Sequence, residues 1–136
     1  MLTPSLDTVR LFLHILAAGV WVGGQITMAG LLPVPRKLDP GAPKAVARAF
    51  AGVAWPALFV AVVTGMWNVF EVDMESLETS YHMTLGIKVL LLVAVAVAAW
   101  FHGVTTNRKV LGATGALGAL GSLVVLFLGV LLQHSA

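Results

Sequence analysis

The chain has 136 residues, of which 59% are hydrophobic and only 10% are charged; its formal net charge is +2, and it contains no cysteine. A soluble domain is about 25% charged, so a chain of this composition lacks the charged residues that a water-exposed surface requires. The small net charge argues against nucleic-acid binding, and the lack of cysteine excludes disulfides and thiolate metal sites. We therefore expect residues 1–136 to form one integral domain in a lipid bilayer.

Four apolar runs predict an all-α fold, an integral membrane four-helix bundle, because a bilayer core requires about 20 consecutive apolar residues per helix. The predicted spans are residues 11–32, 49–70, 83–101 and 110–133. Thr3 and Pro4 predict an N-cap with proline at the first helical position. Pro33 and Pro35 are expected to end the first span. Pro56 lies inside the second span, where neighbouring helices can satisfy the carbonyl that it leaves unpaired.

Charges in the connecting loops predict the orientation. The first and third loops are basic, with Arg36, Lys37, Lys44, Arg48, Arg108 and Lys109, and the second is acidic, with Glu71, Asp73, Glu75 and Glu78. The positive-inside rule places basic loops in the cytoplasm, so both termini and the acidic loop are expected to be extracytoplasmic. The expected location is the cell membrane, plasma or inner, of a bacterium.

Glycines indicate how the helices pack. Gly19 and Gly23 form a GxxxG pair in the first span, and a glycine stripe follows the fourth span at Gly112, Gly115, Gly118 and Gly121. Such surfaces allow two backbones to approach closely, either within one chain or across a homodimer. Intramolecular packing is the simpler interpretation, and a homodimer remains the alternative.

Ionisable side chains at membrane depth are costly and usually functional. His14 and Lys88 each lie about 8–9 Å inside the outer end of their spans, at 1.5 Å per residue. His82 and His134 lie at the outer ends of the third and fourth spans. Three helices therefore bring ionisable groups to the outer leaflet. His102 lies about 21 Å deeper than Lys88, at the cytoplasmic end, where it leaves a second site open.

A polar stripe follows the first span. His14, Ala18, Trp21, Gln25 and Met28 follow a 4-3-4-3 spacing, so they share one helical face. Lipid offers the imidazole and the amide no hydrogen-bond partner, and the stripe is therefore expected to face the bundle interior.

Each candidate residue has a functional and a structural interpretation. The imidazole of His14 can ligate heme iron, bind copper or relay protons, whereas a hydrogen bond to a neighbouring helix is the structural alternative. A neutral Lys88 amine is a possible metal ligand, whereas snorkelling would carry its ammonium to the interface. His82 and His134 lie where polar side chains are expected in any membrane protein. The methionines are scattered, which favours core filling over copper(I) binding.

Several short motifs resemble, in their order and spacing, the copper-resistance D (CopD) family of membrane proteins. They are the run Gly19–Gly24 with His14 upstream, Thr64-Gly65 followed by Asn68, Thr79-Ser80-Tyr81 followed by Leu85 and Lys88, and Asn107-Arg108. The resemblance extends from Arg10 to about Lys109. It implies a minimal membrane protein of copper uptake or tolerance.

The chain is also similar to the HemJ-type protoporphyrinogen oxidases, which are small proteins of four or five spans. In that group a histidine of the first span and a lysine of the third are implicated in binding heme b. The matching residues here are His14 and Lys88. Where that group continues into Leu-Pro-Arg after the tryptophan, this chain reads Met28-Ala29-Gly30.

Three functions remain open at this stage. The first is a heme b protein with a redox role, an electron carrier or a heme-dependent oxidoreductase, with quinone or oxygen as its partner. Its expected cofactor-binding residues are His14, Lys88, Trp21 and Gln25, and its expected metal ligands are His14 and Lys88, with His82 and His134 as replacements for the lysine. The second is copper uptake or tolerance through the outer histidines. The third is a non-catalytic membrane subunit held in place by its glycine faces.

Overall fold

The computed structural model describes residues 3–135, and regular structure in this part of the chain is helical. Its elements are α1 (Leu6–Leu31), α2 (Pro33–Leu38), α3 (Ala42–Phe70), the 3-10 turn η1 (Met74–Ser76), α4 (Thr79–Val104) and α5 (Arg108–Ser135). Four helical segments are long and apolar enough to cross a membrane: α1 with α2, α3, α4 and α5. The predicted all-α fold with four spans is therefore confirmed. The helices extend beyond most of the predicted limits, because a helix that continues past the apolar core keeps its backbone hydrogen bonds.

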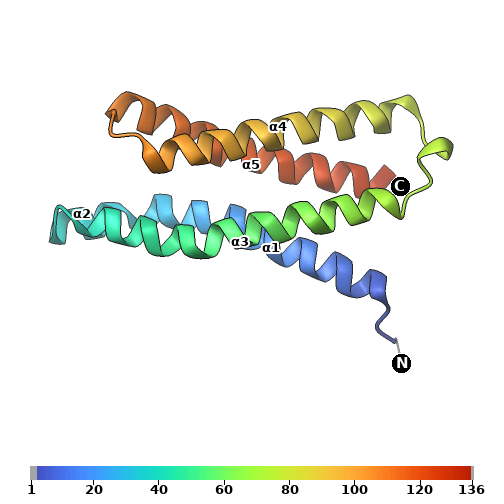
Figure 1. Cartoon of the computed structure of the whole chain (residues 1–136), viewed down its shortest axis with the longest axis horizontal. Helices are drawn as coiled ribbons and strands as arrows, with labels where there is room; N and C mark the ends of the chain where they lie inside the picture. Colours follow the sequence, from blue (N-terminus) through green and yellow to red (C-terminus); the bar gives the residue numbers. More distant parts are fainter. Residues whose placement is uncertain (1–2, 136) are drawn as a thin grey trace. The chain divides into compact units, whose positions relative to one another are not determined.

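The chain divides into two units, one ending at Val72 and one beginning at Asp73. Each unit is an antiparallel helical hairpin (Figure 1): α1 packs on α3 with α2 at their connection, and α4 packs on α5. We call them the first hairpin and the second hairpin. In each hairpin most basic residues lie at the connection between its two long helices, and most acidic residues lie at the opposite end. We call these the basic end and the acidic end.

Helix α1 begins two residues later than Thr3 and Pro4 predicted. Its N-cap is Ser5, whose Oγ accepts a hydrogen bond from the N–H of Thr8 at 3.2 Å. In return, the Thr8 hydroxyl accepts the N–H of Ser5 at 3.3 Å. This capping box satisfies two backbone donors at once, which explains why Ser5 rather than Thr3 starts the helix.

The prolines behave largely as predicted. Helix α1 ends at Leu31, before Pro33, but Pro33 then serves as the first residue of the short helix α2. A proline is tolerated there because the first N–H of a helix has no partner within it. Pro56 lies inside α3, which continues without a break to Phe70.

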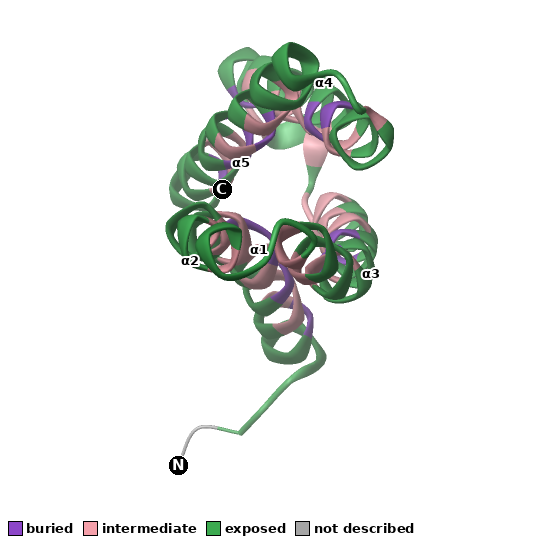
Figure 2. Ribbon diagram, turned by 90° about the vertical axis from the view of Figure 1, so that its left-hand side faces the viewer, coloured by how far each residue is buried: buried purple, intermediate pink, exposed green. Residues whose placement is uncertain are grey.

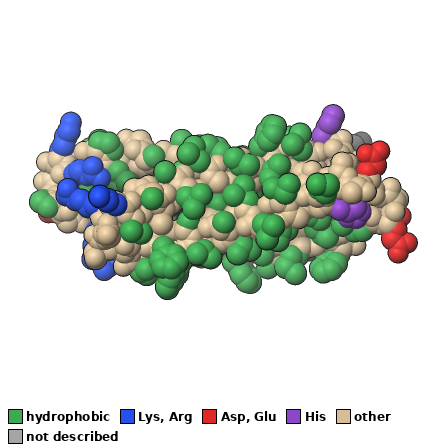
Figure 3. Space-filling model, turned by 90° about the horizontal axis from the view of Figure 1, so that it is seen from above, with side chains coloured by type: hydrophobic (Ala, Val, Ile, Leu, Met, Phe, Trp, Pro, Cys, Tyr) green, Lys and Arg blue, Asp and Glu red, His purple; other side chains and the backbone are tan. Residues whose placement is uncertain are grey.

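The surface of both hairpins is mostly apolar. Buried residues form narrow strips along the helices, and most other positions are exposed (Figure 2), including many large apolar side chains such as Phe12, Phe59, Leu90 and Phe127. Within each hairpin, hydrophobic side chains cover the middle of the helices, and the basic and acidic side chains on the face drawn in Figure 3 lie towards opposite helix ends. Large exposed apolar surfaces mark contact with lipid or other protein. These helices belong to a multi-pass membrane protein.

The glycines pack differently in the two hairpins. Gly19 and Gly23 are exposed, and a Cβ at either would meet no described atom within 4 Å, so the GxxxG pair is not the surface through which α1 packs on α3. The neighbouring Gly24 faces α3, where the ring of Phe50 occupies the space of its missing side chain. In α5 the predicted stripe is used: a Cβ on Gly121 would lie 2.6 Å from Val95 of α4.

Candidate functional site

His14 lies in the first half of α1, towards the acidic end, and is half-buried. Its Nδ1 lies 2.9 Å from the hydroxyl of Thr64 in α3. That hydroxyl donates its only proton to the carbonyl of Val60 at 2.6 Å. The hydroxyl must therefore accept a proton from His14, which assigns the hydrogen to Nδ1 and the lone pair to Nε2. Metal-ligating histidines are oriented by the same kind of hydrogen bond.

The residue after Thr64 makes room for the ring. A Cβ on Gly65 would lie 3.2 Å from Cε1 of His14, so the absence of a side chain lets the imidazole lie against α3. Thr64 itself is only 4% exposed. The Thr-Gly pair, which enters the sequence analysis only as part of a motif, thus holds His14 in two ways: the threonine orients the ring, and the glycine accommodates it.

The predicted polar stripe is the more buried face of α1. His14, Ala18, Gln25 and Met28 are half-buried and Trp21 is buried. Neighbouring positions such as residues 15, 19, 23 and 26 are exposed.

Trp21 is 7% exposed and packs edge-on against Trp55 of α3, with ring centroids 5.8 Å apart. The side-chain amide of Gln25 donates to the carbonyl of Trp21 at 3.3 Å. In this hairpin Trp21 therefore packs α1 on α3, and the amide contact is local to α1.

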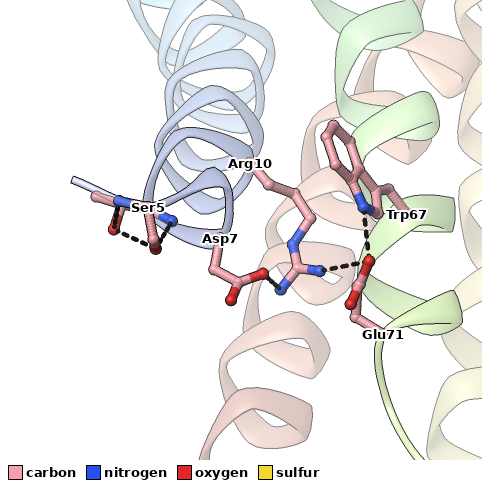
Figure 4. Close-up of polar contacts among 6 residues, drawn as sticks. Ser5, Asp7, Arg10, Trp67 and Glu71 are labelled. Carbon is pink, nitrogen blue, oxygen red and sulfur yellow. Dashed lines mark hydrogen bonds and ion pairs between the residues drawn. The ribbon is translucent and has the colours of Figure 1, made fainter.

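Arg10 lies one helical turn before His14 and was not among the site residues predicted from the sequence. Its side chain extends from α1 towards α3 (Figure 4), with Nη2 3.2 Å from Asp7 and Nη1 3.8 Å from Glu71. The indole of Trp67 donates to the same Glu71 oxygen at 3.0 Å. The i, i+4 spacing to His14 was a signal for this residue, because it continues the polar stripe to the acidic end.

Several buried polar atoms near this end lack a hydrogen-bond partner among residues 3–135. They are Nε and Nη1 of Arg10 and Oδ1 of Asn68. Arg10 is only 9% exposed, so water does not readily replace the missing partners. Buried polar groups usually have a partner, and a guanidinium pairs best with a carboxylate or phosphate. The first hairpin therefore has unused hydrogen-bonding groups at the same end as His14.

Lys88 lies in α4 and is half-buried in the second hairpin. A Cβ on Gly129 of α5 would lie 3.1 Å from its Nζ, so the side chain extends sideways across the neighbouring helix. Gly129 lies six residues before the end of α5 at Ser135, about 9 Å along the axis. The amine therefore lies against α5 and does not reach the end of the hairpin, as full snorkelling would require.

His102 lies at the basic end of the second hairpin, on the exposed surface of α4. Its Nδ1 lies 3.0 Å from the carbonyl of Leu111 and 3.3 Å from the hydroxyl of Thr114, both in α5. A carbonyl can only accept, so Nδ1 carries the hydrogen here too. A Cβ on Gly115 would lie 3.0 Å from the ring.

The remaining predicted ligands lie at the acidic end of the second hairpin. His82 and His134 are both exposed, and the ring of His82 stacks edge-on with that of Tyr81 at 6.3 Å. Within residues 3–135 no three side chains of histidine, aspartate or glutamate come together as a metal cluster. The structure thus describes His14 in the first hairpin, and Lys88, His82 and His134 in the second.

Comparison with known proteins adds no relative. No protein-family model, no curated protein and no solved structure matches this chain. The resemblance to the CopD and HemJ-type families therefore rests on the short motifs, of which Thr64-Gly65 is the one that contacts His14.

Proposed function

We propose that this protein is a heme b-binding integral membrane protein with a redox role. The observation that carries the proposal is the hydrogen bond between Nδ1 of His14 and Thr64, because it assigns the lone pair to Nε2, the atom that would face the iron. The HemJ-type resemblance points to the same histidine. When bound, heme would supply one-electron chemistry, which the protein tunes through the axial ligand and the burial of the site.

The nitrogen-containing side chains of this protein suit heme. His14 would be one axial ligand, and Lys88 is the leading candidate for the other, with His82 and His134 as replacements. Two buried nitrogens of Arg10 form no hydrogen bond within residues 3–135, Nε and the Nη1 that lies 3.8 Å from Glu71, and their N–H groups suit the carboxylate of a heme propionate. All these side chains are nitrogen donors, which can ligate heme iron, whereas copper gains no three-ligand cluster among residues 3–135.

Two further predicted residues have a role in the same proposal. Trp21 and Gln25 lie on the His14 face of α1, one below the other towards the basic end. Trp21 packs on Trp55, and the Gln25 amide is held by the backbone carbonyl of Trp21, so the face has a fixed shape. We propose that Trp21 and Gln25 would line the heme site next to His14.

The test is the absorption spectrum of the full chain. The protein is expressed with a heme precursor, purified in detergent, and measured as isolated and after reduction. A Soret band with the sharp bands of a reduced b-type heme is expected for the wild type. His14→Ala should lose it, and His102→Ala, which removes an imidazole in a similar hydrogen-bonded setting, should retain it. A wild-type protein without a Soret band, even after reconstitution with heme, contradicts the proposal.

A further inference from the structure

A hollow lies at the acidic end of the second hairpin, between the first turns of α4 and the last turns of α5. Its volume is about 160 Å³, and its lining residues are Ser80, Tyr81, Thr84, Leu131, Leu132 and Ser135. An adjoining hollow shares Ser80, Tyr81 and Ser135 and continues to Ser76, Leu77 and Glu78. No lysine or arginine lines either of them.

Tyr81 supplies a hydrogen-bond donor to this hollow. The side chain is only 8% exposed, and it lines both parts of the hollow. Its ring contacts His82, and its hydroxyl forms no hydrogen bond within residues 3–135; that hydroxyl is not among the fully buried unpaired atoms, so it opens onto the hollow. The ring of Tyr81 is packed in place while its hydroxyl opens onto the hollow, so the phenol can donate to a ligand there.

The other hydroxyls of the hollow are acceptors. Thr84 donates its proton to the carbonyl of Ser80 at 2.8 Å, and Ser135 donates to the carbonyl of Leu131 at 2.9 Å. The hydroxyl of Ser80 donates to the carboxylate of Glu78 at 3.3 Å. A hydroxyl has one proton and two lone pairs, so each of these oxygens can still accept a hydrogen bond. The hollow therefore combines one free donor, several acceptors and leucine side chains.

This pattern suits an uncharged ring that both accepts and donates hydrogen bonds. A cavity of about 150 Å³ holds one benzene ring, so the hollow has room for a single six-membered ring. A hydroquinone hydroxyl can accept from Tyr81 and donate to Thr84 or Ser135. A phospholipid headgroup fits less well, because its phosphate would meet no cation among the lining residues.

We propose that this hollow binds the head group of a lipid-soluble quinol, with its isoprenoid tail in the bilayer. The hollow lies at the end of two apolar helices, where a ligand with an apolar tail and a polar head is expected to partition. The inference rests on the proposed redox role, which requires a partner that is soluble in the membrane. It assigns Tyr81 as the residue that orients the ring, with Thr84 and Ser135 as acceptors.

Binding is measured directly on the full chain in phosphatidylcholine nanodiscs. Decyl-ubiquinol is titrated under anaerobic conditions and followed by calorimetry, and saturable binding is expected. Tyr81→Phe should raise Kd roughly 3- to 10-fold, the effect of one lost hydrogen bond. Leu132→Trp should abolish binding by filling the hollow.

A threonine pair provides the matched control. Thr84 and Thr27 each donate to the carbonyl four residues earlier at 2.8 Å, but Thr27 is exposed on α1 and does not line the hollow. Thr84→Val should weaken binding and Thr27→Val should not. Circular dichroism of every variant checks that the helices are retained.

Several outcomes overturn the proposal: no binding by the wild type, an unchanged Kd in both Tyr81→Phe and Leu132→Trp, or competition by phosphatidylethanolamine that depends on the same residues. The heme spectrum of each sample separates this inference from the proposed function. A wild-type Soret band without quinol binding contradicts the quinol site alone. Quinol binding that depends on Tyr81 in a protein without a Soret band supports the site and contradicts the heme proposal.

Discussion

His14 in the first hairpin and His102 in the second are held by nearly the same local structure. Each ring lies over the glycine of a Thr-Gly pair on the neighbouring helix, and each Nδ1 lies near the threonine hydroxyl, at 2.9 Å for His14 and 3.3 Å for His102. Both threonine hydroxyls donate to the carbonyl four residues earlier at 2.6 Å. The two sites differ in their surroundings, because His14 is half-buried and His102 is exposed.

The contact of a histidine with a Thr-Gly pair is therefore not specific to a ligand site. In both hairpins it joins two helices and assigns the lone pair to Nε2 of the histidine. His102 also donates a hydrogen bond to the carbonyl of Leu111. This contact explains His102 as a residue that links α4 to α5. Near His14, in contrast, the nearly buried guanidinium of Arg10 has unused N–H groups. His14 is therefore the stronger candidate ligand of the two histidines, because a buried guanidinium that can bind a carboxylate lies near it.

The largest expected effect is the difference between the two histidines. His14→Ala removes the proposed axial ligand and should lower heme affinity more than about 100-fold, beyond the loss typical of a supporting residue. His102→Ala should leave heme affinity unchanged. Heme titration followed at the Soret band measures both. Equal losses in the two variants would mean that burial does not distinguish the sites.

Substitution of the two threonines should also affect heme affinity unequally, with a smaller difference than for the two histidines. Thr64→Val removes the hydrogen bond that orients His14, and heme affinity should fall roughly 10- to 100-fold. Thr114→Val should leave heme affinity unchanged and cost about 1 kcal/mol of stability. The same titration, with thermal unfolding followed by circular dichroism, gives both values. A similar heme affinity for Thr64→Val and the wild type would assign the Thr64 hydrogen bond a structural role.

A third comparison concerns two glycines of α5. Gly121→Ala places a methyl group 2.6 Å from Val95, whose side chain is fully buried and stiff, so a loss of about 1–3 kcal/mol is expected. A Cβ on Gly112 meets no described atom within 4 Å. Gly112→Ala should therefore be neutral or stabilise the helix by up to about 1 kcal/mol. Unfolding of both variants in the same detergent provides the measurement, and equal values would contradict the close packing of Gly121.

The smallest effect is expected at Gly65 and Gly115. An added Cβ would lie 3.2 Å from His14 in the first case and 3.0 Å from His102 in the second, so either ring has to shift by a few tenths of an ångström. Gly65→Ala should move the Soret maximum slightly at nearly unchanged occupancy, because the axial imidazole tilts. Gly115→Ala should leave the spectrum unchanged. An identical spectrum for Gly65→Ala and the wild type would argue that His14 does not touch the iron.

The membrane character, the number of spans and the buried face of α1 are all encoded locally. Apolar runs of sufficient length predict the four long helices, and the spacing of His14, Trp21 and Gln25 predicts which face of α1 is buried. Both follow from neighbours along one helix. The N-cap at Ser5 was missed although it is also local, since the capping box uses Thr8 in place of the usual glutamate or glutamine.

The contacts between helices depended on the tertiary structure. His14 meets Thr64 and Gly65, fifty residues away, and Lys88 meets Gly129, only after the antiparallel register of each hairpin is formed. Composition carries no information about register, which explains why intramolecular packing was predicted for the GxxxG pair at Gly19 although α1 meets α3 through other residues. The sequence alone determined a four-span membrane protein with a polar stripe in its first span. Only the folded hairpins decided which threonine orients the histidine and which glycines make room, because those partners are brought together by side-chain packing across helices.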